Sequence, residues 1–127
     1  MVRDNRISAV LVSSDLDQAQ RFYEERVGLA LSAETIKNHL VFECGSGTSL
    51  LIYGRPSGNQ ADHTQVRFWT RDIDKDVAEL VAKGIEFEEY DTDTFKTVNH
   101  VVTSKGIGRS AWFKDGDGNT IALFQPE

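Results

Sequence analysis

The chain repeats itself, and this repetition constrains the fold more than any single motif. The Asp-Leu-Asp of residues 15–17 matches the Asp-Ile-Asp of residues 72–74. A longer pattern, Phe-x-x-Gly-x-Gly-x-x-Leu over residues 42–50, recurs as Phe-x-x-Gly-x-Gly-x-x-Ile over residues 113–121. The sequence therefore predicts two copies of one structural unit within 127 residues.

Each copy contains one segment with helical periodicity, Ser14–Val27 in the first and Asp72–Lys83 in the second. Their apolar residues recur at the spacing of one helix face. Ser14 and Asp17 fit a loose capping box at the start of the first helix, and Asp72 can cap the second. The two segments are therefore predicted to form amphipathic helices.

Runs with the alternation of β-strands surround each helix and are separated by turn residues. In the first copy these runs are Ile7–Val12, Ala30–Glu34, His39–Cys44 and Thr48–Tyr53. In the second they are Thr64–Trp69, Ile85–Tyr90, roughly Val98–Thr103, Ser110–Lys114 and Thr120–Gln125. The prediction is an α+β fold of two βαβββ modules in a single domain. The modules span residues 1–55 and 64–127, and the polar stretch 56–63 links them.

Composition narrows the class of protein. Hydrophobic residues make up 39% and charged residues 27% of the chain, which is typical of a soluble globular domain. No run of about 20 apolar residues could span a membrane, and the N-terminus lacks the apolar core of a secretory signal. The net charge of −6 comes without a basic stripe, which disfavours nucleic acid as a partner. With the single cysteine, Cys44, these features predict a cytoplasmic protein.

Three stretches give the chain a family resemblance: VSSDLDQAQRFYEERVGL, RDIDKDVAELVAKGIEF and AWFKDGDGNTIALFQ. They resemble the vicinal oxygen chelate superfamily, and the last is similar to its recurrent F-x-D-P-x-G-N-x-I-E-L ending. The superfamily includes glyoxalase I, extradiol dioxygenases, fosfomycin-resistance transferases and bleomycin-resistance binding proteins. The resemblance implies paired modules whose sheets curl around a cleft, with helices outside. It also implies a homodimer, whose modules could pair within one chain or across the dimer.

Enzymes of this superfamily usually hold a divalent metal with four side chains, two in the first strands and two in the last strands of the modules. Carried over by spacing, these positions are Ser8, Leu51, Gln65 and Ala122. Leucine and alanine have no donor atom, serine is a poor ligand and glutamine alone is weak. We therefore expect neither a metal nor another cofactor, and no catalytic residue is assigned.

Side chains alternate along a strand, so the residues that share a face with these four positions should line the cleft. The predicted ligand-binding residues, which include Trp112 from the eighth strand-like run, are Ser8, Val10, Leu51, Tyr53, Gln65, Arg67, Trp69, Trp112, Ala122 and Phe124. This set is mostly apolar and aromatic, with one guanidinium and one amide. It suits an organic ligand with flat rings and a few polar groups.

Several of these assignments leave an alternative open. Val10 and Leu51 could belong to the core instead of the cleft. Arg67 lies within an apolar strand, so it is either at an exposed edge or has a specific partner, such as a carboxylate or a ring. Of Trp112 and Phe113, one should be core and the other should face the cleft or a dimer contact. We expect Phe113 in the core, with Phe42 at the equivalent place.

Two further features have ordinary alternatives. The stretch Tyr90–Val101 is long and polar and contains an exposed-looking Phe95, so it could close a cleft or form an ordinary long hairpin. The loop Asp115–Asn119 begins like a calcium loop but lacks the later ligands, so a hairpin turn is favoured. The three histidines, His39, His63 and His100, are not paired at ligand spacing.

Three functions follow from these observations. The leading one is metal-independent binding of a small aromatic molecule, an antibiotic or another natural product, which gives resistance by sequestration. The alternative is a small-molecule-modifying lyase or oxygenase of the superfamily with an atypical or absent metal site. The third is a non-catalytic module whose sheets serve dimerisation. One fold hosts many activities, so the sequence does not name the ligand.

Overall fold

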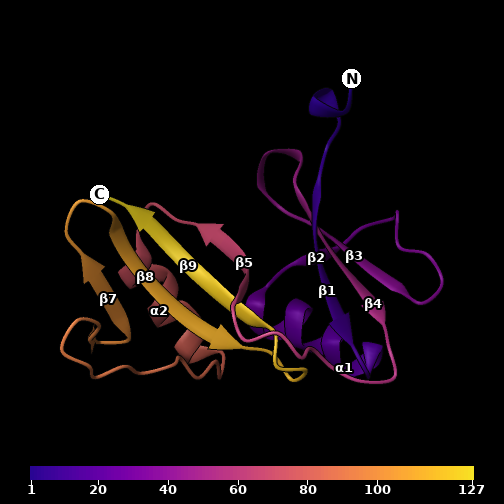
Figure 1. The fold of residues 1–127 in the computed structure, drawn as a ribbon. Coiled ribbons are helices and arrows are strands. Elements are labelled where there is room, and N and C mark those ends of the chain that lie inside the picture. Colours follow the sequence, from indigo (N-terminus) through magenta and orange to yellow (C-terminus); the bar gives the residue numbers. More distant parts are fainter. The chain divides into compact units, whose positions relative to one another are not determined.

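The computed structural model describes residues 1–127, except for the side chain of Val2. It divides into two compact units (Figure 1). The first consists of residues 1–61 and 116–119, and the second of residues 62–115 and 120–127. Each unit has its own sheet, so the α+β class is confirmed. No helix among the described residues is long and apolar enough to cross a membrane.

The first unit has a sheet with the strand order β1-β4-β3-β2. Strand β1 runs parallel to β4, and β3 is antiparallel to β4. The elements in chain order are a 3₁₀ turn (Val2–Asp4), β1 (Ser8–Ser13), α1 (Leu16–Arg21), the π-helix η2 (Phe22–Val27), β2 (Ala30–Leu31), β3 (His39–Glu43), a 3₁₀ turn (Gly45–Gly47) and β4 (Ser49–Gly54).

The second unit repeats this topology with one more strand, in the order β5-β9-β8-β7-β6. Strand β5 runs parallel to β9, and β8 is antiparallel to β9. The elements are β5 (Thr64–Trp69), α2 (Ile73–Ala82), β6 (Thr97–Val98), β7 (Val101–Ser104), β8 (Gly108–Lys114) and β9 (Thr120–Pro126).

In each unit one face of the sheet is buried and carries the core. Phe42 and Tyr23 are fully buried in the first unit, and their ring centroids lie 5.8 Å apart. Phe113 takes the equivalent place in the second unit with 1% of its surface exposed. Both phenylalanines are therefore core residues, as the sequence predicts.

The first helix differs from its prediction at the start and in its second half, and it ends where the sequence predicts. Asp15 caps it by accepting a hydrogen bond from the Gln18 N–H at 3.1 Å. The expected capping residue, Ser14, instead donates its N–H and hydroxyl to Asp117 Oδ1, at 2.9 and 3.0 Å. After Arg21 the helix widens into η2 and ends at Gly28, whose φ of 89° is left-handed. A glycine adopts that conformation without a steric cost.

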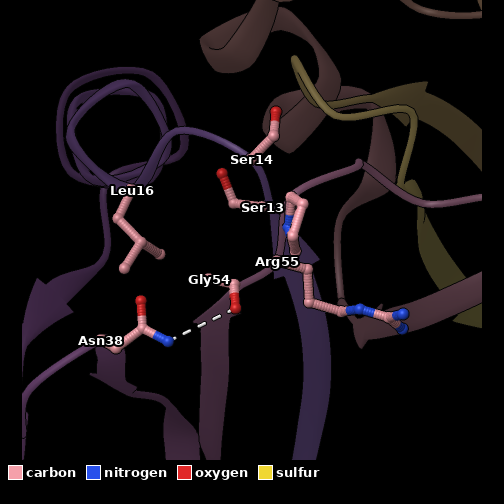
Figure 2. Close-up of a pocket in the computed structure, with 7 residues that line it drawn as sticks. Ser13, Ser14, Leu16, Asn38, Gly54 and Arg55 are labelled. Carbon is pink, nitrogen blue, oxygen red and sulfur yellow. Dashed lines mark hydrogen bonds between the residues drawn. The ribbon is translucent and has the colours of Figure 1, made fainter.

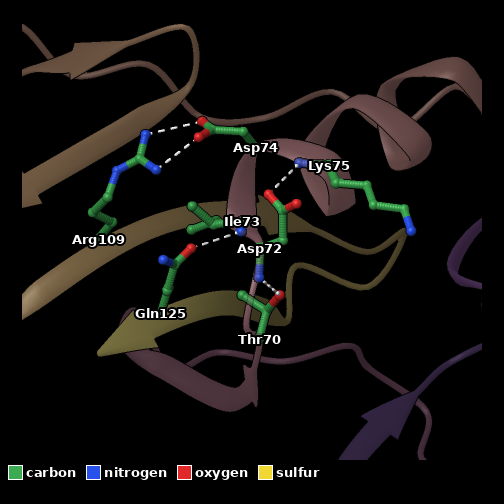
Figure 3. Close-up of polar contacts among 7 residues, drawn as sticks. All are labelled: Thr70, Asp72, Ile73, Asp74, Lys75, Arg109 and Gln125. Carbon is green, nitrogen blue, oxygen red and sulfur yellow. Dashed lines mark hydrogen bonds and ion pairs between the residues drawn. The ribbon is translucent and has the colours of Figure 1, made fainter. Parts of the chain in front are cut away.

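The second helix begins where the sequence predicts, and a set of polar groups fixes its N-terminus (Figure 3). Asp72 Oδ1 accepts a hydrogen bond from the Lys75 N–H at 3.2 Å, so Asp72 is the cap. Thr70 Oγ1 accepts from the Asp72 N–H, and Gln125 Oε1 accepts from the Ile73 N–H at 2.8 Å. These bonds satisfy amide groups that a helix start leaves unpaired.

An ion pair joins the first turn of α2 to β8 (Figure 3). The Arg109 guanidinium donates two hydrogen bonds to the Asp74 carboxylate, at 2.8 and 2.9 Å. These hydrogen bonds lower the pKa of Asp74 and raise that of Arg109. The fork-to-carboxylate geometry orients the helix on the sheet as well as pairing the charges.

The loop before β9 belongs to the first unit. Its Asp117 accepts the two hydrogen bonds from Ser14, and its Asn119 side chain donates to the Val12 carbonyl oxygen at 2.9 Å. The Asn59 amide also donates to the Gly118 carbonyl oxygen at 3.2 Å. The expected turn is confirmed, and its hydrogen bonds connect it to Val12, Ser14 and Asn59 of the first unit.

Two strand predictions in the second unit are wrong. Residues 85–90 form no strand, because only Phe87 pairs with β8, as an isolated bridge to Phe113. Residues 98–103 are not one strand but parts of the β6–β7 hairpin. It turns at Asn99 and His100, whose φ angles are 51° and 73°. Two successive left-handed residues suit a tight hairpin turn.

Candidate functional site

The open face of each sheet, opposite the core, carries the residues that the sequence assigns to a ligand. On β1, Leu11 is buried while its neighbour Val10 is 54% exposed. On β5, Val66 is buried while Arg67 is exposed and Trp69 is 66% exposed. The alternation therefore places the core on one face and the predicted site residues on the other.

The first sheet brings four predicted residues together. Val10 lies directly opposite Leu51 in the β1–β4 pair, and Ser8 lies opposite Ser49, with their hydroxyl groups in hydrogen-bond contact. Tyr53 lies two residues beyond Leu51, on the same face and opposite His39. Its ring centroid is 6.2 Å from that of the imidazole. Val10 is therefore not a core residue, and its place in a ligand cleft stays a prediction.

The second sheet brings five predicted residues together in two cross-strand rows. Each row crosses the three paired strands β5, β9 and β8. The first row consists of Arg67, Ala122 and Trp112, and the second of Trp69, Phe124 and Ser110. Ala122 and Phe124 are only 2% and 6% exposed. The Phe124 ring contacts Trp69 and the Arg67 guanidinium. A ligand on this face would therefore meet Arg67, Trp69 and Trp112 first, with the two buried residues as the floor.

Arg67 has aromatic partners on this face. Its guanidinium carbon lies 4.4 Å from the Phe124 ring centroid and 4.8 Å from that of Trp69. The two rings meet edge to face at 5.3 Å. Cations attract the negative faces of aromatic rings, so these contacts hold the guanidinium in place.

Gln65 lies at an irregularity that the sequence did not indicate. The β5–β9 register shifts between Thr64 and Val66. Gln65 Oε1 accepts a hydrogen bond from the Thr120 N–H at 2.7 Å, while its Nε2 is buried without a hydrogen-bond partner among the described residues. The Gln65 side-chain oxygen thus satisfies a backbone N–H of β9 at the register shift, so this oxygen is already engaged.

The four positions that match metal ligands do not fit a divalent metal. The Ser8 hydroxyl is paired with Ser49, the Gln65 oxygen with the backbone, and Leu51 and Ala122 have no donor atoms. In the part of the chain that the structure describes, no three His, Cys, Asp or Glu side chains gather as metal ligands do. The donor set suits no ordinary metal centre.

Sequence reasoning missed an aromatic cluster on the second unit. Tyr90 and Phe95 pack against Trp112, with ring centroids 5.7 and 5.2 Å from the indole and 5.0 Å from each other. Phe95 is therefore half-buried and not exposed. Burial raises the pKa of Tyr90, and the charge of Glu88 adds to this shift. Tyr90 and Phe95 lie in one loop, but Trp112 lies on β8, so no local pattern could have joined all three rings.

The first unit also has two cavities that the sequence did not predict. A shallow one of about 360 Å³ is lined by Ser13, Ser14, Leu16, Asn38, Gly54, Arg55 and Pro56 (Figure 2). The Asn38 side chain there donates to the Gly54 carbonyl oxygen at 3.4 Å. None of the ten predicted ligand-binding residues lines this cavity, so it is separate from the open sheet face.

The second cavity, of about 250 Å³, is lined by Arg6, Ser32, Glu34, Val41, Glu43, Cys44, Gly47, Thr48 and Ser49. Burial raises the pKa of the Cys44 thiol, and a backbone hydrogen bond with Leu50 offsets part of the rise. A raised pKa keeps the sulfur protonated and weakens it as a nucleophile. The cavity is therefore lined by polar groups, and its Cys44 thiol is not activated as a nucleophile.

Comparisons with known proteins agree with the fold. An antibiotic binding protein, TnmS3 from Streptomyces sp. CB03234, is 27% identical, with a TM-score of 0.68 over 97% of this chain and 96% of that one. The bleomycin-binding protein in complex with bleomycin is 19% identical, with a TM-score of 0.73 over 97% and 99%. Lactoylglutathione lyase from Agrobacterium tumefaciens is 20% identical, with a TM-score of 0.70 over 95% and 92%.

The bleomycin-binding protein and the lyase are both under 25% identical to this chain, so these two similarities show the fold alone. A comparison with curated proteins gave no match. The family model of the Glyoxalase/Bleomycin resistance protein/Dioxygenase superfamily matches residues 6–123. This match covers most of the chain, and the chain belongs to that superfamily.

Proposed function

We propose that this protein binds a small aromatic molecule, an antibiotic or another natural product, without a metal and thereby sequesters it. The observation that carries the proposal is the open face of the second sheet. Its metal-equivalent positions, Gln65 and Ala122, offer no metal site, whereas Arg67, Trp69 and Trp112 offer rings and a cation. The 27% identity to an antibiotic binding protein supports the same assignment.

The physical basis would be ring stacking and burial of apolar surface. An aromatic group that buries about 200 Å² gains about 5 kcal/mol at 25 cal/mol per Å². Association costs at least a similar amount in lost translational and rotational freedom. Useful affinity therefore needs several contacts at once. We propose that all ten predicted residues, Ser8, Val10, Leu51, Tyr53, Gln65, Arg67, Trp69, Trp112, Ala122 and Phe124, contribute to the site.

The remaining parts of the proposal concern the setting of the site. We propose that the modules 1–55 and 64–127, with residues 56–63 as the linker, are its building blocks. We also propose that the protein works as a homodimer in the cytoplasm. The exposed apolar side chains of Val10 and Trp69 support the dimer, because exposed apolar surface favours association.

The test is a thermal-shift screen of the metal-stripped protein. Its panel holds Zn²⁺, Ni²⁺, Mn²⁺ and Fe²⁺ together with flat aromatic natural products, flavins and glycopeptide antibiotics. A ligand that binds only the folded state raises the melting temperature. We expect a rise with at least one aromatic compound and none with the metals. A clear rise with a metal alone would favour the enzyme alternative.

A pair of variants links any binding to the open face. Trp69 and Ile107 both lie in the second unit and are similarly exposed, at 66% and 64%. Ile107 lies in the turn between β7 and β8, away from the row that contains Trp69. We expect Trp69→Ala to abolish most of the ligand-induced shift and Ile107→Ala to retain it. If both variants retain the ligand-induced shift equally, the ligand binds elsewhere on the protein.

A further inference from the structure

We propose that the ligand carries a planar anionic group, a carboxylate, which pairs with Arg67 while its ring contacts Trp69. This inference rests on the proposed function and adds the charge of the ligand to it. It follows from three properties of Arg67: the guanidinium is held in place, its hydrogen-bond donors are unused, and its immediate neighbours are uncharged.

The guanidinium is held by rings instead of by an acid. Its carbon lies 4.4 Å from the Phe124 centroid and 4.8 Å from the Trp69 centroid. A flexible surface arginine loses rotamer freedom when it binds an anion, and this loss weakens binding. The ring contacts of Arg67 reduce this loss, because they already restrict the side chain before a ligand arrives.

The N–H groups of Arg67 have no hydrogen-bond or ion-pair partner among the described residues, since ring contacts are all that it makes. Arg109, on the other side of the same sheet, shows the contrast, because its fork is filled by Asp74. A guanidinium presents five donors in a fixed fork that matches a carboxylate in two parallel hydrogen bonds. Arg67 therefore offers a ligand an unfilled fork.

The residues around Arg67 on its face carry no charge. Gln65 and Trp69 flank it along β5, Ala122 lies opposite it, and Trp112 lies one strand further. Glu88 lies beyond Trp112, where its N–H donates to the Trp112 carbonyl oxygen. An unpaired cation among aromatic side chains, in a protein with net charge −6, is a local reversal of sign. It favours a ligand with a single negative charge.

A carboxylate fits this setting better than a phosphate. One guanidinium supplies one positive charge, which balances a monoanion but not a dianion. The exposed Trp69 ring lies next to the guanidinium and provides a surface for the apolar body of the ligand. A flat ring with an attached carboxylate satisfies both features together.

Three compounds with one ring system and different charges test the proposal: 2-naphthoate, 2-naphthalenemethanol and 2-naphthalenemethylammonium. Their binding to the full-length protein is measured by quenching of tryptophan fluorescence and by calorimetry at low salt. We expect the carboxylate to bind at least fivefold more tightly than the alcohol, and the ammonium compound to bind most weakly. Of the three compounds, only the carboxylate should bind more weakly when salt is added, because salt screens its charge pair with Arg67.

Variants assign the preference to Arg67. Arg67→Gln should remove the advantage of the carboxylate and leave the affinity for the alcohol within about threefold. Arg67→Lys should keep part of the advantage, because the charge stays while the fork is lost. Arg26→Gln makes the same change of net charge on an exposed residue of η2 and should change neither affinity.

The outcomes separate this inference from the proposed function. If the wild-type protein binds the alcohol and the carboxylate equally, or if Arg67→Gln keeps the difference, the anion is not recognised by Arg67 and the inference is overturned. The proposed aromatic binding would stand in that case. If none of the three compounds binds and the natural-product screen is also negative, both proposals fail.

Discussion

Arg67 and Gln65 show what single residues reveal before a structure is known. The sequence marks Arg67 because a charge within an apolar strand lies at an exposed edge or has a partner. Arg67 is exposed on the edge strand β5, and its guanidinium also contacts Trp69 and Phe124. Gln65 could not be anticipated in the same way. Its side-chain oxygen accepts a backbone hydrogen bond where the register between β5 and β9 shifts. A register shift depends on both strands, and the sequence pattern of one strand does not contain it.

The Asp74–Arg109 pair gives a pH-dependent prediction. Arg109 lowers the pKa of Asp74 in the folded protein below its ordinary value of 3.8. The pair therefore stabilises the fold above that value, and the contribution is lost as the pH falls through the lowered pKa. We expect Asp74→Asn to lower the melting temperature by a few degrees at pH 7. The difference from wild type should shrink as the pH falls below 3.8 and vanish below the lowered pKa of Asp74.

The matched control is Asp93→Asn, since Asp93 is exposed and makes no ion pair within the described chain. It removes the same charge without removing a salt bridge, so its melting temperature should follow that of the wild type across the pH range. An equal loss in both variants at pH 7 would show that net charge, and not the ion pair with Arg109, carries the effect.

At the scale of elements, segments that pair with a neighbouring strand along most of their length followed their sequence patterns, and segments without such a neighbour did not. β5 covers Thr64–Trp69, as predicted, because it lies beside β9 over most of its length. The equally strand-like residues 85–90 form a single bridge with β8, between Phe87 and Phe113. Alternation indicates that a segment can be a strand, but a neighbour must be present to accept its hydrogen bonds.

Two glycines allow backbone strain to be separated from steric crowding. A Cβ added to Gly106 or to Gly45 would meet no atom within 4 Å, and only Gly106 has a left-handed φ, of +83°. We expect Gly106→Ala to lower the free energy of unfolding by about 1–2 kcal/mol, because L-residues pay that amount in this conformation. Denaturant unfolding at constant m-value measures the change.

Gly45→Ala supplies the comparison for this prediction. Its backbone is not left-handed, so alanine should be neutral or stabilise the fold by up to about 1 kcal/mol through the unfolded chain. A loss of similar size at both positions would mean that the turn between β7 and β8 is not under the backbone constraint described.

At the scale of the whole molecule, the repeat and the family ending were sufficient to predict the α+β class and the superfamily. Alternation separates the two faces of each strand, and Val10, Arg67 and Trp69 lie opposite the core. That they line a ligand cleft stays a prediction. The cluster of Tyr90, Phe95 and Trp112 was not predictable. Its members come from a loop and a distant strand, and packing between them depends on tertiary structure.

The exposed apolar residues also lead to a prediction about assembly. Val10 is 54% exposed and Trp69 is 66% exposed, although both lie in regular strands. We expect the protein to sediment at twice the mass of one chain, with dissociation on dilution. Sedimentation velocity over a hundredfold range of concentration measures this. A single-chain mass throughout that range would contradict the proposed homodimer.

The loop of residues 116–119 has a consequence for any attempt to divide the protein. The first unit is not encoded by one continuous stretch, because Asp117 and Asn119 hold Ser14 and the Val12 carbonyl oxygen. A gene cut at the linker would yield a first half that lacks four residues of its own unit. Such a fragment should need a peptide that carries the missing loop before it regains its structure, so the duplicated modules are no longer interchangeable parts.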